Sequence, residues 1–387
     1  MQPIPLDRDL SEDPVEMVRL IKDYVYARDL FYETSPVVGE KFFGRRALLQ
    51  SLGDDVKNQR VSGLFGLRKA GKTSVMKQLA ADLDGRHHVS VLLDLEGFPC
   101  PPDDPVPDIL RVLRRKLTEE LKAKNLKRRE LSELGDSISI VDFKLAFQTL
   151  LNKLESDGVS VLILLDEIEY LTPSESVDIA EGPMPSISQL LGALRSLAQE
   201  VGNFTFLLSG LTSSIIESGR LYGRPNPLFA WAKQYYLRPF DKNEAAELAL
   251  SISGRMGIEI NDDALDALFE ASGGHAYLYR NLASEVVRSL PLDTFRRIMT
   301  RPDVLRALTG WQDGITGNVK EMIDHVRRYY PTEEILLSIL MDDPAEFREY
   351  AKIEPLAVRH LLGLGLVETD ATLGYRPNSL LELMPHG

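Results

Sequence analysis

The chain has 387 residues, of which 44% are hydrophobic and 27% are charged, and its formal net charge is −13. This length suits two or three domains with cores of ordinary size, and the composition excludes a chain that is disordered throughout. A single cysteine, Cys100, excludes a disulfide framework and a multi-cysteine metal site, while the negative charge argues against a surface built mainly for nucleic acid or anionic lipid.

The N-terminal region predicts a short leader and no targeting segment. It shows no basic-then-apolar signal pattern, and no apolar run in the chain approaches the ~20 residues that span a bilayer. We therefore expect a cytoplasmic protein without a membrane partner. Residues 1–36 form the leader, and apolar side chains at helical spacing predict one amphipathic helix in it: Val15, Val18, Ile21 and Val25.

The chain after the leader shows three successive patterns. Residues 37–240 alternate helical stretches with five nearly unbroken apolar runs, at Val61–Phe65, Val89–Leu95, Val161–Leu165, Phe204–Leu208 and Tyr235–Leu237. Such runs are typical of strands covered on both faces, so we expect an α/β domain with a parallel sheet between helices. Residues 241–309 predict a helical lid. Residues 310–387 predict three helices followed by a β-hairpin, which is the layout of a winged helix.

A glycine-rich turn lies between the first apolar run and a helical stretch. Residues Gly66–Thr73 fit the phosphate-loop pattern G-x-x-x-x-G-K-[ST]. In such a turn successive backbone N–H groups face one anion, and the helix N-terminus adds partial positive charge. The lysine would reach the outer phosphates and the threonine hydroxyl would bind magnesium. The predicted nucleotide-binding residues of this segment are Gly66, Arg68, Lys69, Ala70, Gly71, Lys72, Thr73 and Ser74.

A second motif follows about 95 residues later, where the apolar run Val161–Leu165 ends in Asp166 and Glu167. These carboxylates are expected at the carboxyl edge of the sheet, where open α/β sheets bind ligands. Asp166 would hold magnesium through water, and Glu167 would act as the general base on the attacking water. The alternative is a structural role, in which the two acids only complement the dipole of the next helix.

Two further segments allow both a catalytic and a structural interpretation. The run Phe204–Leu208 ends in polar residues, of which Ser209 or Thr212 would contact the γ-phosphate or the water; a helix cap is the equal alternative. His275, after a glycine pair, is a candidate phosphate contact, although an isolated histidine at a helix start is more often structural.

An arginine supplied across an oligomer interface would complete such a site. The candidates are Arg195, Arg220, Arg224 and Arg238, and we favour Arg224. The basic stretch Arg111–Arg129 also contains several acidic residues, so a solvated helix face is preferred there over a nucleic-acid contact.

Together these motifs resemble a family. Phe42-Phe43-Gly44-Arg45-Arg46-Ala47-Leu48-Leu49 resembles the F-x-G-R-x-x-E-L box of the extended AAA+ ATPases, within which the chain is most similar to the STAND signal-transduction NTPases and the archaeal-type ATPases. Phe65–Ser74, Asn226–Phe229 and Tyr236–Phe240 share the resemblance, which covers roughly residues 27–290. It implies that the box lies beside the adenine, so that Val37, Val38, Gly44 and Arg45 would contact the base.

The chain departs from the family pattern at two places. Gly274-His275-Ala276 stands where the family has Gly-His-Pro, and the acid of the box has no counterpart among Ala47, Leu48 and Leu49. Family members commonly join an effector domain and a sensor domain to the ATPase, and neither is evident around the predicted domains. Effector and sensor are therefore expected on other chains.

The leading hypothesis is an ATP- and magnesium-dependent switch that hydrolyses ATP slowly to ADP and controls self-assembly or a separate effector protein. The alternative is a DNA-acting AAA+ ATPase of the origin-recognition or transposition type. Residues 311–387 contain 7 Lys+Arg against 13 Asp+Glu, a net charge of −6, which disfavours nucleic acid as the partner. A third hypothesis is a nucleotide-stabilised scaffold without turnover.

Overall fold

A computed structural model describes residues 15, 28–85, 87–100, 103–126, 129–135, 137–172, 186–291 and 296–383. Backbone contacts divide the chain into two units. The first, called the sheet unit here, comprises Val37–Leu237 and His325–Glu334. The second, called the helical unit, comprises Met1–Pro36, Arg238–Asp324 and Ile335–Gly387.

The sheet unit is built on a five-stranded parallel sheet, which confirms the predicted fold class. Its spatial order is β2-β3-β4-β1-β7, so that β4 lies between the strand before the phosphate loop and the strand that carries Asp166. The strands are β1 (Ser62–Phe65), β2 (His88–Asp94), β3 (Ser160–Asp166), β4 (Phe204–Gly210) and β7 (Lys233–Tyr236). A small antiparallel hairpin, β5 (Arg220–Leu221) with β6 (Arg224–Pro225), precedes β7.

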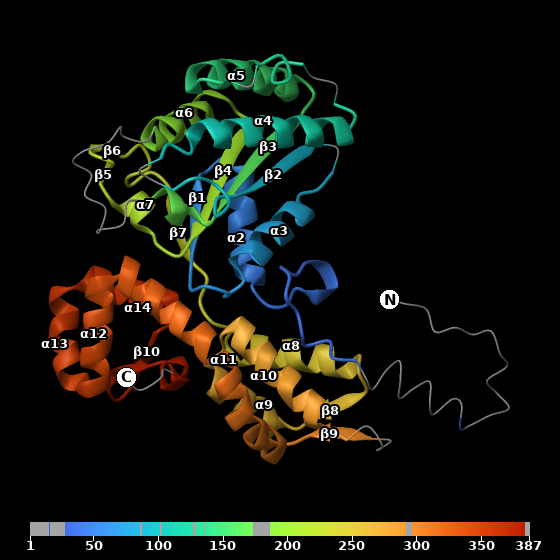
Figure 1. Cartoon of the computed structure of the whole chain (residues 1–387), viewed down its shortest axis with the longest axis vertical. Helices are drawn as coiled ribbons and strands as arrows, with labels where there is room; N and C mark the ends of the chain where they lie inside the picture. Colours follow the sequence, from blue (N-terminus) through green and yellow to red (C-terminus); the bar gives the residue numbers. More distant parts are fainter. Residues whose placement is uncertain are drawn as a thin grey trace. The chain divides into compact units, whose positions relative to one another are not determined.

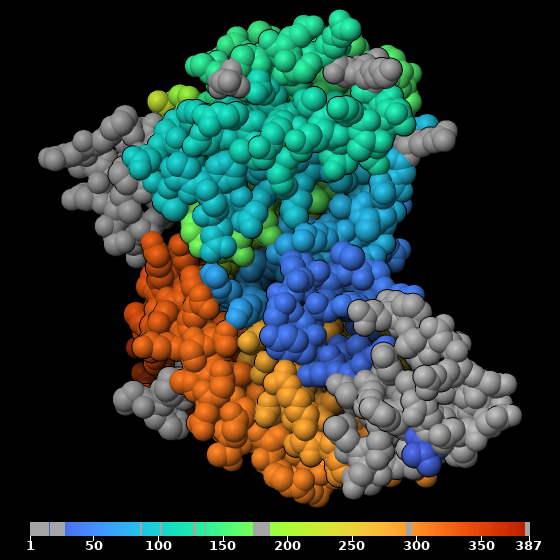
Figure 2. Space-filling view, turned by 45° about the vertical axis from the view of Figure 1, so that its right-hand side comes forward, coloured from blue at the N-terminus to red at the C-terminus, as the bar shows by residue number. Residues whose placement is uncertain are grey.

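Helices cover both faces of this sheet (Figure 1), with α2 and α3 on one side and α4, α5 and α6 on the other. Residues of the α4 and α5 region, teal to green in Figure 2, form much of the outer surface of the sheet unit in that view. The helical elements are η2 (Gly39–Lys41), α2 (Arg46–Lys57), α3 (Lys72–Asp82), α4 (Val106–Ala123), α5 (Ile140–Ser156), η3 (Ile168–Leu171), α6 (Ile187–Glu200) and α7 (Ser214–Glu217).

Burial on both faces explains the unbroken apolar runs. All seven residues of β4 are buried, and six of the seven residues of β3. The core between the sheet and helices α4–α6 includes an aromatic chain in which Phe147 meets Phe204 edge-on at 5.1 Å between ring centroids. Fully burying such a side chain contributes ~1.5–3 kcal/mol, so this face fixes the strands firmly.

In the helical unit, the first helix after Arg238 is α8, and nearby residues set its start. Asp241 accepts a hydrogen bond from the backbone N–H of Glu244, whose side chain in turn accepts one from Asp241 N–H, and this capping box sets the start of α8. The elements are α8 (Lys242–Gly254), β8 (Ile258–Ile260), α9 (Asp262–Ser272), α10 (Ala276–Ser289), β9 (Arg297–Met299), α11 (Arg301–Tyr329), α12 (Pro331–Asp342), α13 (Pro344–Ile353), α14 (Pro355–Leu364), β10 (Val367–Asp370), β11 (Gly374–Pro377) and η5 (Ser379–Leu383).

The C-terminal part differs in detail from the sequence interpretation. Helix α11 runs without interruption through residue 310, where the boundary between the lid and the last domain is expected. A mid-helix glycine costs only ~1 kcal/mol, and the buried side chains of Trp311, Ile315 and Val319 on one helix face outweigh it. Helix α13 was not predicted, since its apolar positions are few. The β10–β11 pair forms the expected antiparallel hairpin.

Most of the expected leader helix lies outside the described residues. The end of the leader packs within the helical unit: Phe31 is fully buried, and Arg280 donates hydrogen bonds to the carbonyls of Leu30 and Phe31 at 3.2 and 3.1 Å. Ser284 also donates to the Asp29 carboxylate at 2.5 Å. These contacts tie the segment before Val37 to α10.

The glycine pair before α10 allows one close backbone approach. Gly274 has φ +70°, and a Cβ there would collide with the carbonyl oxygen of Phe240, whose N–H donates to Gly274 O at 2.8 Å. A Cβ at the neighbouring Gly273 would likewise collide with the side-chain oxygen of Asn378. The pair therefore brings three segments of the helical unit together.

We expect Gly274→Ala to destabilise the helical unit by more than ~2 kcal/mol, because the left-handed conformation alone costs ~1–2 kcal/mol and the new methyl group collides with Phe240. The matched control is Gly310→Ala, in the exposed middle of α11 with no atom within 4 Å of the new Cβ. It should stabilise by ~0.5–1 kcal/mol. Urea unfolding followed by circular dichroism measures both, and equal effects of the two substitutions would contradict the packing described here.

Candidate nucleotide site

The phosphate loop connects β1 to α3 with a backbone that few residues tolerate. Lys69 and Gly71 have φ values of +61° and +106°, both in the left-handed region. At Gly66 the constraint is space, because a Cβ would stand 2.9 Å from the carbonyl oxygen of Leu237 on the adjacent chain segment. The N-cap residue of α3 is Gly71, which makes no side-chain cap hydrogen bond. Backbone N–H groups at such a helix start are the donors that an anion site uses.

Lys72 places its charge over this loop. The side chain is only 5% exposed, and its Nζ donates to the carbonyl oxygens of Gly66 and Leu67 at 3.1 Å each. Both carbonyls belong to the loop, so the ammonium group is held at the mouth of the turn. This is the position from which a lysine neutralises the outer phosphates of a nucleotide.

Thr73 and Asp166 meet at the carboxyl edge of the sheet. Thr73 Oγ1 donates to Asp166 Oδ2 at 2.6 Å, although 93 residues separate them and β4 lies between β1, which leads to the loop before Thr73, and β3, which ends at Asp166. Asp166 is 3% exposed, and burial raises the pKa of its carboxyl group, while the bond from Thr73 partly offsets that shift. The two residues predicted as magnesium ligands are therefore brought together.

The residues of this edge fit a magnesium ion in its usual protein setting. Among the described residues no group of three or more His, Cys, Asp and Glu side chains could hold a metal alone. Mg²⁺ is commonly bound by one or two protein oxygens together with water and substrate phosphates. Thr73 and Asp166, beside an anion-binding loop, match that donor set.

Glu167 combines an unusual backbone conformation with a raised pKa. Its φ of +56° is unusual for a residue other than glycine, and its N–H donates to Asp166 Oδ1 at 3.0 Å. Burial raises the pKa of its carboxyl group to about 7; the Glu169 carboxylate adds to the rise, and Lys72 opposes it. A carboxyl group with a pKa near neutrality is suited to proton transfer.

The two hydroxyl candidates near the end of β4, Ser209 and Thr212, have different surroundings. Ser209 is fully buried, and its hydroxyl is close enough to lower the pKa of Asp166, yet Oγ has no hydrogen-bond partner of ordinary geometry among the described residues. Thr212 Oγ1 instead accepts from the N–H of Ser214, at the start of α7. Ser209 therefore lies beside Asp166, while the Thr212 hydroxyl binds the first backbone N–H of α7.

The segment predicted beside the adenine lies against α3. Val37 N–H donates to Ser74 Oγ at 3.0 Å, and Gly39 N–H donates to Gln78 Oε1 at 2.6 Å. Val38, between them, is 43% exposed, which leaves its side chain free to cover a base. Gly44 and Arg45 follow with φ values of +65° and +62°, and their turn leads into α2.

The remaining candidates are placed as follows. Arg224 is exposed at the β5–β6 hairpin, whereas Arg195 donates to Pro227 O at 2.5 Å and stacks on the Trp231 ring. Arg68 lies 3.8 Å from Glu96, within the sheet unit. His275 is 1% exposed at the start of α10, in the helical unit, and Arg238 is exposed in that unit.

Sequence reasoning passed over Glu169. It is 7% exposed, and its Oε2 accepts from the backbone N–H of Leu211, just after β4, at 3.0 Å. The signal was the third acid in Asp166-Glu167-Ile168-Glu169, which ordinary motif patterns do not include. This carboxylate links the ends of β3 and β4.

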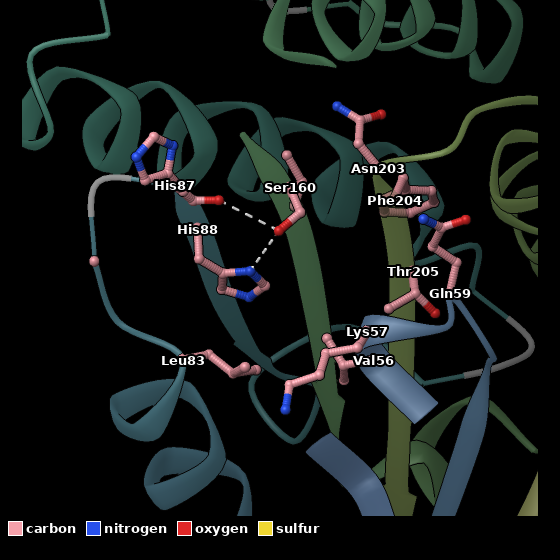
Figure 3. Close-up of a pocket in the computed structure, with 12 residues that line it drawn as sticks. Val56, Lys57, Gln59, Leu83, His87, His88, Ser160, Asn203, Phe204 and Thr205 are labelled. Carbon is pink, nitrogen blue, oxygen red and sulfur yellow. Dashed lines mark hydrogen bonds between the residues drawn. The ribbon is translucent and has the colours of Figure 1, made fainter. Parts of the chain in front are cut away.

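A cavity of about 410 Å³ lies at the opposite, amino edge of the sheet (Figure 3). Its lining includes Lys57 at the end of α2, Leu83 at the end of α3, and His88, whose Nδ1 lies 2.7 Å from Ser160 Oγ. The carbonyl end of a helix carries partial negative charge, which favours a basic side chain such as that of Lys57 beside it. The cavity is separate from the phosphate loop, which is at the carboxyl edge.

Comparison with known proteins supports an AAA-type P-loop domain. Residues 55–215 match the family model described as "AAA domain". A Walker-type ATPase of Pyrococcus abyssi has a similar structure, with a TM-score of 0.65 and 15% identity over 92% of this chain and 99% of that chain. The ORC2 protein of Aeropyrum pernix, solved in ADPNP and ADP complexes, gives a TM-score of 0.55 and 13% identity over 92% and 94%. No curated protein sequence matches this chain.

At such low identity the structural matches show the fold alone. The sheet unit has the fold of the P-loop AAA+ ATPases, as predicted, and a mainly helical region follows it. No helix of the described residues has the length and apolarity to cross a membrane.

The pKa of Glu167 generates a prediction about stability. A carboxyl group whose pKa in the folded state, about 7, exceeds its ordinary value of 4.5 stabilises the fold at low pH, and this contribution is lost as pH rises from 4.5 to 7. The glutamine of Glu167→Gln does not ionise, so the variant avoids this loss of stability. Its Tm should therefore exceed that of wild type by more at pH 8 than at pH 5. The exposed Glu155→Gln is the control, and a gain independent of pH would count against burial as the cause.

Proposed function

We propose that this protein is a magnesium-dependent ATPase switch that binds ATP, hydrolyses it slowly to ADP and phosphate, and thereby controls self-assembly or a separate effector protein. The observation that carries the proposal is the 2.6 Å contact between Thr73 and Asp166 beside the buried Lys72. A chance phosphate-loop match would have no reason to place its threonine on a buried carboxylate from a strand that is not adjacent to it.

In this proposal each residue of the site contacts a different part of the nucleotide or the magnesium ion. The N–H groups at the start of α3 and the Lys72 ammonium group bind the β- and γ-phosphates, and Val38, Gly44 and Arg45 flank the adenine. Thr73 and Asp166 hold magnesium, which when bound neutralises charge on the phosphates and orients them. Ser209 donates its buried hydroxyl to the γ-phosphate or to the attacking water.

Glu167 accepts the proton of the attacking water. With a pKa of about 7, roughly half of the Glu167 side chains are protonated at neutral pH, and only the charged half can act as a base. Arg224, exposed on its hairpin, is the residue that a neighbouring copy would contribute to the developing charge on the γ-phosphate.

The switch depends on a difference in nucleotide affinity between two conformations. A hundredfold difference corresponds to only ~2.7 kcal/mol, which a few contacts to the γ-phosphate supply. We propose that helices α12–α14 and the β10–β11 hairpin form a winged-helix module and that this module presents the output surface. The STAND-type role rests on the resemblance of the Phe42–Leu49 box.

Lys72→Ala should weaken binding of ATP by at least ~100-fold, because it removes the ammonium group that is held on the loop carbonyls. Isothermal titration calorimetry with Mg-ATP measures the loss. The matched control is Lys77→Ala, on the exposed part of the same helix, which should bind as wild type does. Unchanged binding and unchanged partner association in Lys72→Ala would end the proposal.

Glu167→Gln should retain ATP binding and lower the hydrolysis rate by ~10²–10⁴-fold, since the amide cannot accept the proton. Phosphate release under single-turnover conditions reports the rate, and in wild type that rate should rise with pH through about 7. Phosphate release that is absent in wild type and unaltered in the variant would favour a nucleotide-stabilised scaffold.

A DNA-acting ATPase is the competing function, and the fold similarity to an ORC2 protein is the observation that favours it. Affinity for DNA depends on phosphate contacts from basic residues, and residues 311–387 carry a net charge of −6. We expect no shift of duplex DNA at 50 or 200 mM salt in an electrophoretic assay with Mg-ATP. Binding that weakens steeply between the two salt concentrations would favour the competing function instead.

A further inference from the structure

The loop after β4 is held from two sides by residues that the proposed catalytic steps do not use. On one side Glu169 Oε2 accepts from Leu211 N–H at 3.0 Å. On the other side Tyr330 OH donates to Leu211 O at 3.1 Å and accepts from Ser213 N–H at 3.1 Å. Both backbone groups of Leu211 are thereby fixed by buried side chains.

Burial makes these bonds costly to lose. Tyr330 is 3% exposed and Glu169 is 7% exposed, while Leu211, Thr212 and Ser213 are each no more than 2% exposed. A buried N–H or carbonyl group that loses its partner incurs the full free-energy penalty of desolvation. The loop after β4 is therefore expected to move together with the side chains of Glu169 and Tyr330.

The β4 tip has little room to shift independently of Glu169. A Cβ at Gly210 would collide with Glu169 Oε2 and with Ile168 Cγ2. Only glycine allows the strand end to pack this closely on η3. If the backbone at Ser209, the residue before Gly210, is displaced, the backbone at Leu211 must therefore move with it.

Tyr330 belongs to a short segment with a particular place in the chain. It lies between the last residue of α11 and the first residue of α12, within His325–Glu334. This segment belongs to the sheet unit, although the chain on either side of it belongs to the helical unit. Ser213 Oγ adds contacts to Tyr236 OH at 3.1 Å and Glu217 Oε2 at 3.0 Å, which join the tyrosine to a polar network of the sheet unit.

We propose that Glu169 and Tyr330 are positioning residues that hold the loop after β4 and make the α11–α12 corner respond to the γ-phosphate at Ser209. This inference rests on the proposed function, because it takes Ser209 as a nucleotide contact. It adds the route of regulation: a change at the end of β4 passes through Leu211 and Ser213 to Tyr330, and α11 and α12 continue from there into the helical unit.

The test is hydrogen–deuterium exchange of residues 325–334 in the full chain, with Mg-ADP and with the non-hydrolysable analogue Mg-AMPPNP. In wild type we expect slower exchange with the analogue. Tyr330→Phe should reduce that difference by about 5–10-fold, the worth of one buried hydrogen bond, and should change the Kd for the analogue by less than about twofold. The matched control is Tyr222→Phe, which removes a buried hydroxyl bonded to Leu171 O at 2.9 Å and should keep the full difference.

Glu169 provides a second, independent variant pair. Glu169→Leu leaves the Leu211 N–H without an acceptor and should abolish the nucleotide-dependent difference, whereas Glu169→Gln keeps an acceptor oxygen and should restore most of it. A difference retained in Tyr330→Phe, or absent from wild type with the analogue bound, would overturn the inference and leave the nucleotide site standing. If wild type does not bind the analogue at all, both this inference and the proposed function fall.

Discussion

The site depends on one hydrogen bond, from Thr73 Oγ1 to Asp166 Oδ2, because it joins the start of α3, which follows β1, to the end of β3, and β1 and β3 are not neighbours in the sheet. The loop after β1 and the end of β3 are separated by β4, so their side chains meet only if the strand order and the register are both correct. A slip of one residue in β3 would turn Asp166 to the other face and leave a buried carboxylate without its partner. The strand order and register of the parallel sheet therefore bring the residues of the site together.

The same edge concentrates carboxyl groups in little space. Asp166, Glu167 and Glu169 lie within four residues, and burial raises the pKa of the first two. Their surroundings differ: Asp166 accepts from the phosphate-loop threonine, the pKa of Glu167 is raised to about 7, and Glu169 accepts from a backbone N–H just after β4. Environment, and not residue type, separates the three roles.

The end of β4 is the natural place for a regulatory contact because it lies between the strands of the phosphate loop and of Asp166. Its residues are buried, its glycine allows close packing on η3, and its following loop reaches Tyr330 at the α11–α12 corner. A site built from strand ends is rigid, whereas a loop fixed by two hydrogen-bonding side chains can take a second position as a unit. Those properties suit the switch that we propose.

Local patterns in the sequence were enough to predict the parallel sheet, the phosphate loop and the acidic strand end, because those features follow from apolar runs, a glycine spacing, and two acids after a strand. They also predicted the C-terminal hairpin, but they indicated a domain boundary within what is one continuous helix, α11, since a glycine signal is local and the packing that overrides it is not. Only the tertiary structure distinguished Ser209 from Thr212, and only it revealed Glu169 and Tyr330. These roles depend on which backbone groups a side chain reaches across 42 or 119 residues of sequence, and no local pattern contains that information.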